Sequence, residues 1–255
     1  MTRPILLHIP HASTAIPERW RETFLLDGNE LEREILVMTD WYTDELFDLG
    51  DAADRLVFPV SRLLVDVERF HNDHDEPMAE KGMGAVYSKT HDGRPLKSAE
   101  RRGELMSAYY VPHHDALELW ATESLEHYGK CLILDCHSFP SQPLPCDMSQ
   151  TPDRPDICIG TSKLHSQLGL VAAARSAFEA AGWSVKLDVP YFGTMVPLPF
   201  FGREPRLASI MVEVNRRLYL DEISGEKLGS FPELKQQLVG ALEDIAAYWL
   251  SLGSK

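Results

Sequence analysis

The sequence of 255 residues has no apolar run near the roughly 20 residues that a membrane-spanning helix needs. Its first residues, MTRPILLHIPHAS, do not form a signal peptide pattern, because His8 and Pro10 interrupt a short apolar segment. Positive charge is also scarce: 25 Lys and Arg stand against 39 Asp and Glu, for a net charge of −14. Such a charge argues against surfaces that bind nucleic acid or acidic membranes. We therefore expect a cytoplasmic protein whose partners are small molecules.

Several sequence motifs are missing as well. The four cysteines include no Cys-x-x-Cys pair, so we expect reduced thiols and no disulfide framework. No Gly-Lys-Ser/Thr phosphate loop follows a strand pattern. Ser138 lacks the Gly-x-Ser-x-Gly elbow, which disfavours serine-hydrolase chemistry.

Apolar and amphipathic segments alternate along the chain. Strands are expected at residues 4–10, 55–60, 63–67, 132–137, 156–160, 184–188 and 207–215. Helices are expected at residues 29–50, 98–128 with a kink near Pro112, 164–182 and 232–253. This order predicts a single α/β domain over residues 1–255, with a mixed, largely parallel sheet flanked by helices. The aromatic and Pro/Gly-rich loop at 189–202 is long enough to wall a pocket.

Polar residues gather where the expected strands end, and in an open α/β sheet these ends share one crevice. Asp135 and His137 lie on one face of their strand by alternation, so His137 could ligate a metal while Asp135 fixes its tautomer. The alternative is a buried histidine satisfied by a neighbour. His11, past the end of the first strand, is a better candidate ligand than His8 inside it. Asp40 is the acid that we would test as a ligand.

Glu213 lies inside the last apolar strand, where a carboxylate is costly unless it is paired or functional. Two histidines and one acid would form an open zinc site with a fourth position for water. Glu213 could then take a proton from that water while the metal polarises a carbonyl. The set predicts amide hydrolysis.

Arg62 and Arg69 flank acidic residues at the end of the 63–67 segment and could hold a substrate carboxylate. The alternative is that both form internal ion pairs. We expect Ser138 and Asn215 to complete the substrate contacts, and His114 to support the metal ligands as a second-layer residue.

Seven blocks of sequence resemble the N-formylglutamate amidohydrolase family over nearly the whole chain: HIPHAS, MTDWYTDELF, VSRLLVDVERF, YYVPHHDAL, LILDCHSFP, DICIGT and IMVEVNRRLYLDE. That family is in turn similar to the zinc carboxypeptidases and the aspartoacylase group. The resemblance implies a zinc-carboxypeptidase-like fold with His137 as the last zinc ligand. It also implies that Asp66 orients a ligand histidine, that Arg69 grips a substrate carboxylate and that Glu213 is the general base.

The sequence also departs from the carboxypeptidase pattern. Thr14 stands where the His-x-x-Glu motif has its acid, so Asp40 is the candidate for the third ligand. Glu68 replaces an Asn beside the expected anion clamp, and Asn215 and Arg216 are the residues that could compensate.

The expected function is that of a zinc-dependent amidohydrolase that removes an N-acyl group, such as formyl, from an acidic amino acid, with N-formyl-L-glutamate as the example substrate. One alternative is a hydrolase of another N-acyl amino acid or a small peptide. A second is a small-molecule binding protein without catalysis on the same scaffold.

Overall fold

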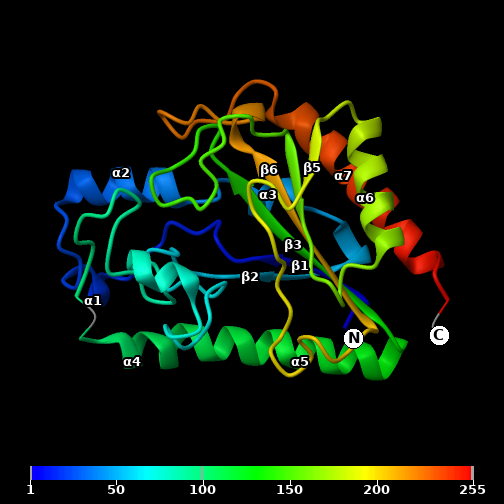
Figure 1. Ribbon diagram of the computed structural model, residues 1–255, viewed down its shortest axis with the longest axis horizontal. Helices are drawn as coiled ribbons and strands as arrows, with labels where there is room; N and C mark the ends of the chain where they lie inside the picture. The colour runs from blue at the N-terminus through cyan, green and yellow to red at the C-terminus, as the bar shows by residue number, and fades with distance from the viewer. Residues whose placement is uncertain (1, 99, 254–255) are drawn as a thin grey trace.

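A six-stranded sheet forms the centre of the computed structural model, which describes residues 2–98 and 100–253 (Figure 1). The strand order is β2-β1-β3-β6-β4-β5. The strands are β1 (Ile5–Ile9), β2 (Asp54–Val57), β3 (Cys131–Phe139), β4 (Ile157–Gly160), β5 (Val185–Leu187) and β6 (Leu207–Asn215). All neighbours are parallel except β4 and β6, which are antiparallel. The prediction of a mixed, largely parallel sheet is confirmed.

Helices cover both faces of the sheet, as Figure 1 shows. The helix α5 (Val111–Tyr128) packs on one face, where its Leu117 and Trp120 share a core with Ile133. The helices α6 (Leu168–Ala180) and α7 (Phe231–Ser251) pack on the other face. Every residue of β1, β3 and β6 is buried, because these three strands are covered on both sides. Their sequences are accordingly nearly continuous apolar runs.

The remaining helical segments are short, and most precede β3. They are α1 (Glu18–Arg21), α2 (Gly28–Met38), α3 (Thr43–Leu46), η1 (Gly50–Ala52), η2 (Pro77–Lys81), α4 (Arg102–Leu105), the π-helical η3 (Met106–Tyr110) and η4 (Arg216–Leu218). A capping box begins α2, in which Asp27 and Glu30 satisfy each other's backbone N–H groups. Within the described residues, the helices are either too short or too polar to cross a membrane.

The single helix expected at 29–50 is wrong. The helix α2 ends at Met38, Thr39 is extended, and Tyr42 adopts a left-handed φ of 59° before α3 begins. Asp40 therefore lies in a break between two helices and not on a helix face.

Two further expectations need correction, at residues 63–67 and at the start of the helix expected from residue 164, and the long helix expected at 98–128 is divided. Residues 63–67 form turns and no strand; they are buried because they pack in a second apolar cluster. The helical stretch expected at 98–128 begins at Arg102 and contains the π-helical η3 directly before Pro112, a feature that often kinks helices, so the kink stays a prediction. The helix expected from 164 begins at Leu168, because residues 163–165 form a turn.

Candidate active site

A cavity of about 550 Å³ opens at the carboxyl ends of the central strands. Its lining includes most of the side chains that the sequence singled out: His11, Asp40, Arg62, Arg69, His114, His137, Ser138 and Glu213. The loop at 189–202 forms one wall, as expected from its length and composition. The crevice predicted from the strand ends is therefore present.

Local backbone geometry directs Asp40 toward this cavity. Its N–H donates to the carbonyl of His11 at 3.0 Å, and the Thr43 hydroxyl donates to the Asp40 carbonyl at 2.9 Å. These two bonds hold the break between α2 and α3 against the end of β1. Asp40 is 2% exposed.

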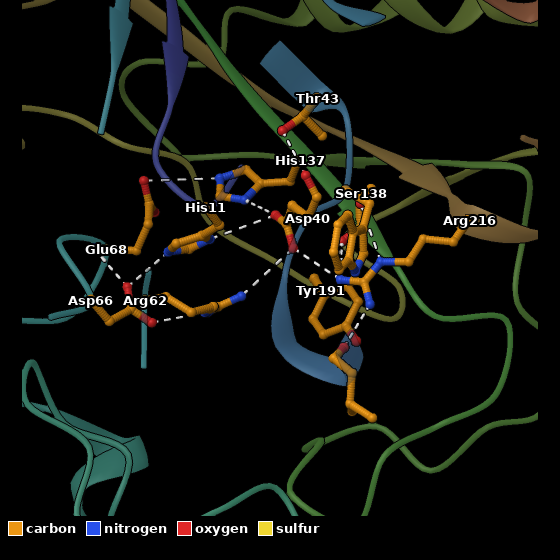
Figure 2. Close-up of polar contacts among 12 residues, drawn as sticks. His11, Asp40, Thr43, Arg62, Asp66, Glu68, His137, Ser138, Tyr191 and Arg216 are labelled. Atoms are coloured by element: carbon orange, nitrogen blue, oxygen red, sulfur yellow. Dashed lines mark hydrogen bonds and ion pairs between the residues drawn. The ribbon is translucent and has the colours of Figure 1, made fainter. Parts of the chain in front are cut away.

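Two imidazoles converge on one carboxylate oxygen (Figure 2). Asp40 Oδ2 lies 3.0 Å from His137 Nδ1 and 3.6 Å from His11 Nδ1. The ligand atoms of these three residues all lie within 4.8 Å of one another. His11 Nδ1 is buried and has no hydrogen-bond partner in the structure. Two imidazole nitrogens and a carboxylate oxygen are a donor set typical of catalytic zinc, and the unpartnered nitrogen is aimed into it, so these residues fit such an ion.

In each of these histidines the second ring nitrogen, Nε2, contacts an aspartate. His11 Nε2 lies 2.9 Å from Asp66 Oδ1, and His137 Nε2 lies 3.1 Å from Asp135 Oδ1. An ionised carboxylate only accepts hydrogen bonds, so both Nε2 atoms carry the proton and donate it. In the neutral rings this leaves both Nδ1 lone pairs free for a ligand.

The charge states of Asp66 and His137 follow from their surroundings. Burial opposes ionisation of Asp66, but Arg62, His11 and Arg69 outweigh it and keep the pKa of Asp66 well below its ordinary value. Burial likewise disfavours a charged His137, but Asp135 and Asp40 raise its pKa well above the ordinary value. Metal binding at His137 Nδ1 would therefore displace a proton.

Glu213 lies beside this group, because β6 pairs with β3 in the register that sets Glu213 opposite His137. Glu213 is 7% exposed, and its buried Oε2 atom has no hydrogen-bond partner. Burial raises the pKa of Glu213 to about 8, against the opposing effect of His137 and with the support of Asp40. A carboxyl group in such surroundings can take up and return a proton near neutral pH.

Two of the three arginines that line the cavity make hydrogen bonds and ion pairs within the protein. Arg62 binds Asp66 at 2.9 Å and the Tyr87 hydroxyl at 3.2 Å, and it lies 3.7 Å from Asp40. The structure thus places Arg62 in the ion pairs that were the alternative expectation. Arg216 binds Asp40 Oδ1 at 3.0 Å, as well as the Val37 carbonyl and Ser138.

Arg69 differs from both. Its nearest acid is Asp66, with Nε 3.5 Å from Oδ2, and Nε makes no hydrogen bond. Its side chain is 23% exposed at the cavity. Arg69 is therefore the lining arginine best placed to receive an anion.

The other predicted site residues fall into two groups. His114 lines the cavity and contacts the Val67 carbonyl through Nε2 at 2.9 Å, and Ser138 accepts from Arg216. Asn215 does not line the cavity, so the expectation that it contacts the substrate is wrong. The strand ends there, and the Asn215 side chain instead donates to Pro155 and caps η4.

Some contacts at the site had no signal in the sequence. The Tyr87 hydroxyl donates to Asp66, and the buried Lys97 amine donates to the carbonyls of Leu63 and Leu64, within the turn that precedes Asp66. Both residues lie between η2 and α4. Neither residue belongs to a periodic pattern or a sequence motif, because their roles depend on contacts between distant segments.

The model of the N-formylglutamate amidohydrolase family matches residues 3–220. The chain belongs to this family. It is 25% identical over 231 residues to the N-formylglutamate deformylase of Pseudomonas putida, which spans 86% of this chain and 82% of that protein. Membership of the family makes the chain a hydrolase of the amidohydrolase type.

Two solved structures share the fold. The N-formylglutamate amidohydrolase from Ralstonia eutropha JMP134 has a TM-score of 0.82 at 20% identity, covering 97% of this chain and 94% of that one. A gene product from Agrobacterium tumefaciens has a TM-score of 0.62 at 21% identity, covering 95% and 92% of the two chains. At these identities the likeness extends to the fold alone.

Proposed function

We propose that this member of the family is a zinc-dependent amidohydrolase that cleaves the N-acyl bond of an N-acyl amino acid. N-formyl-L-glutamate, which is the substrate in the names of its relatives, is the reference substrate. The observation that carries the proposal is the convergence of His11 Nδ1, His137 Nδ1 and Asp40 Oδ2 beside the unpaired Glu213 carboxyl group. Zinc held by these three ligand atoms would supply a Lewis acid for the acyl carbonyl and would lower the pKa of a bound water.

The residues of the chain divide the remaining work. Asp66 and Asp135 hold the two imidazoles in the tautomer that presents Nδ1. Glu213 accepts a proton from the attacking water as the oxygen bonds to the acyl carbon. Glu213 then returns this proton to the amine nitrogen as the carbon–nitrogen bond breaks, so that a carboxylic acid and a free amino acid leave. Arg69 holds the substrate carboxylate during these steps.

The first experiment measures the metal content of protein purified without a chelator, by elemental analysis. We expect about one zinc per chain in the wild type, and little in His137→Ala. His74→Ala, at an exposed histidine outside the cavity, is the matched control and should retain zinc. The wild type should release formate from N-formyl-L-glutamate, lose this activity with chelator and regain it with zinc.

Two results would contradict the proposal. Protein that takes up no zinc even when it is offered would remove the metal from the mechanism. Zinc-loaded protein that binds N-acyl amino acids without turning any of them over would instead support a binding protein on this scaffold.

A further inference from the structure

Two arginines of the cavity lining have donors that the protein itself does not use. Arg69 Nε makes no hydrogen bond. Arg62 bonds Asp66 and Tyr87 through Nη2 and Nε, but its Nη1 lies 3.7 Å from Asp40 Oδ1, beyond hydrogen-bond distance. Both guanidinium groups contact Asp66 Oδ2, so they lie close together. Together they can hold the two carboxylates of an N-acyl glutamate.

These arginines lie on the β1 side of the candidate ligands. Within the segment 62–69, Asp66 bonds His11, which follows the end of β1. In the strand order β1-β3-β6-β4, His137 on β3 and Glu213 on β6 come next. An acyl carbon placed at the ligands and Glu213 therefore has the arginines on one side and the β6 and β4 strands on the other.

The loop that walls the cavity lies on that second side. The Thr194 hydroxyl bonds the Ser209 hydroxyl on β6 at 2.6 Å, and a backbone carbonyl of the loop lies close to Gly160, at the end of β4. Figure 2 shows Arg62 and the loop residue Tyr191 on opposite sides of the ligand group. A substrate with its carboxylates on the arginines thus directs its acyl group toward this loop.

The cavity lining on the loop side is apolar. It includes the buried Met195 and Met211 and three exposed side chains: Phe192 (68%), Leu198 (52%) and Phe201 (49%). Methionine side chains adapt to ligands of different shape. Exposed apolar side chains gathered around a concave site are a mark of ligand binding. A formyl group has only a hydrogen beyond its carbonyl carbon, so it leaves this wall without a partner.

The size and polarity of the cavity agree with a longer acyl group. Its volume of about 550 Å³ is in the range of about 300–1,000 Å³ found for sites of drug-sized ligands, which are larger than N-formyl-L-glutamate. Hydroxyl groups on the loop side are used within the protein: that of Thr161 donates to Asp188, and that of Tyr191 donates to Asp147. The space beyond the scissile carbonyl is therefore suited to a neutral, apolar chain.

We propose that the enzyme also hydrolyses N-acyl glutamates whose acyl group is a neutral, unbranched chain of several carbons. The chain lies against the two methionines and the exposed side chains of the loop, while Arg62 and Arg69 hold the carboxylates. The oxygen of water bonds to the acyl carbon, the carbon–nitrogen bond breaks, and the nitrogen takes a proton, so that a carboxylic acid and glutamate leave. This inference rests on the proposed function and adds an acyl subsite to it, with N-formyl-L-glutamate retained as a substrate.

The test compares kcat/KM of the zinc-loaded wild type for N-acetyl-L-glutamate and N-hexanoyl-L-glutamate, with N-formyl-L-glutamate as the reference. The acetyl and hexanoyl carbonyls have similar reactivity, so their ratio reports contacts of the chain. We expect kcat/KM to be at least about tenfold higher for the hexanoyl compound, the low end of discrimination by an apolar pocket. Hydrolysis of N-formyl-L-glutamate with no gain from acetyl to hexanoyl would retain the proposed function and overturn the inference.

A pair of rim variants locates the acyl chain. Phe192→Ser should lower the hexanoyl-to-acetyl ratio by about three- to tenfold. Phe70→Ser is the matched control, because Phe70 is also an exposed aromatic residue of the lining (43%) but stands next to Arg69, and it should leave the ratio unchanged. A ratio lowered by Phe70→Ser and not by Phe192→Ser would place the chain on the arginine side and overturn the inference.

A wild type that hydrolyses none of the three compounds would overturn the proposed function. Calorimetric titration of that protein with the acetyl and hexanoyl compounds then decides the inference by itself. Binding of N-hexanoyl-L-glutamate at least about tenfold more tightly retains the acyl subsite. Equal binding of the two compounds overturns it as well.

Discussion

Replacing Glu213 by Gln should change activity and stability in opposite directions. The substitution keeps the size of the side chain and removes its ability to take a proton. General acid–base catalysis contributes about 10²–10⁴-fold, so turnover of the zinc-loaded enzyme should fall by about that factor. Zinc content should stay the same, because the proposed ligands are His11, Asp40 and His137.

The stability of the metal-free protein should rise, because the Glu213 carboxylate is buried next to Asp40. The pKa of Glu213 is about 8, against an ordinary value of 4.5. The folded state therefore binds the proton more tightly than the unfolded state, and stability falls as pH rises between these values. At pH 7 the difference of 2.5 pH units, at 1.36 kcal/mol each, corresponds to about 3 kcal/mol.

Thermal unfolding of protein treated with chelator checks this magnitude. For a chain of this size about 3 kcal/mol corresponds to roughly 6–12 °C in Tm. Glu213→Gln should gain that much at pH 7 and little at pH 5. Glu126→Gln, at an exposed acid on α5, is the control and should show no such dependence. A Glu213→Gln protein that melts at or below the wild type at pH 7 would refute the reasoning.

Three further substitutions test other parts of the structure. Asp66→Asn removes the charge behind His11 and should weaken zinc binding about 10–100-fold, measured by competition with a chelator. The hydrogen bond with Glu34 raises the pKa of His91, so its contribution to stability is present below pH 6.5 and is lost as pH rises through the raised value. His91→Gln should therefore lower Tm most at acidic pH. Gly160→Ala would push its Cβ against a backbone carbonyl of the loop that walls the cavity, and should cost about 1–3 kcal/mol in urea unfolding.

The parts of the site that lie on strands could be predicted from sequence. His137 and Glu213 stand in long apolar runs, and a polar residue in such a run is conspicuous because burial makes it costly. His11 follows directly after another apolar run. The order of the strands then brings these residues to one edge of the sheet.

The position of Asp40 could be guessed but its surroundings could not. The apolar spacing of α2 continues through Tyr42 and Leu46, so periodicity predicts one long helix. The break depends on contacts with distant segments: the carbonyl of His11 and the guanidinium of Arg216, which is 176 residues away along the chain. The local sequence pattern therefore cannot predict such contacts.

The prediction of a strand at residues 63–67 was wrong for a related reason. Its residues are fully buried, as a strand pattern requires, but their backbone forms turns held by contacts such as the Lys97 amine. Burial alone does not decide between a strand and a packed turn. The same turns carry Arg62 and Asp66 into the site.

The convergence of His137 and Asp40 has a consequence for folding. These two residues are 97 positions apart, and in the folded protein their contact is supported by the pairing of β1 with β3 and by the bond from the break after α2 to the end of β1. Partly folded chains therefore lack the complete set of proposed ligands, and we expect zinc capture to be among the last events of refolding. Zinc uptake would then report the formation of tertiary structure, and its time course should match the slowest step of that process.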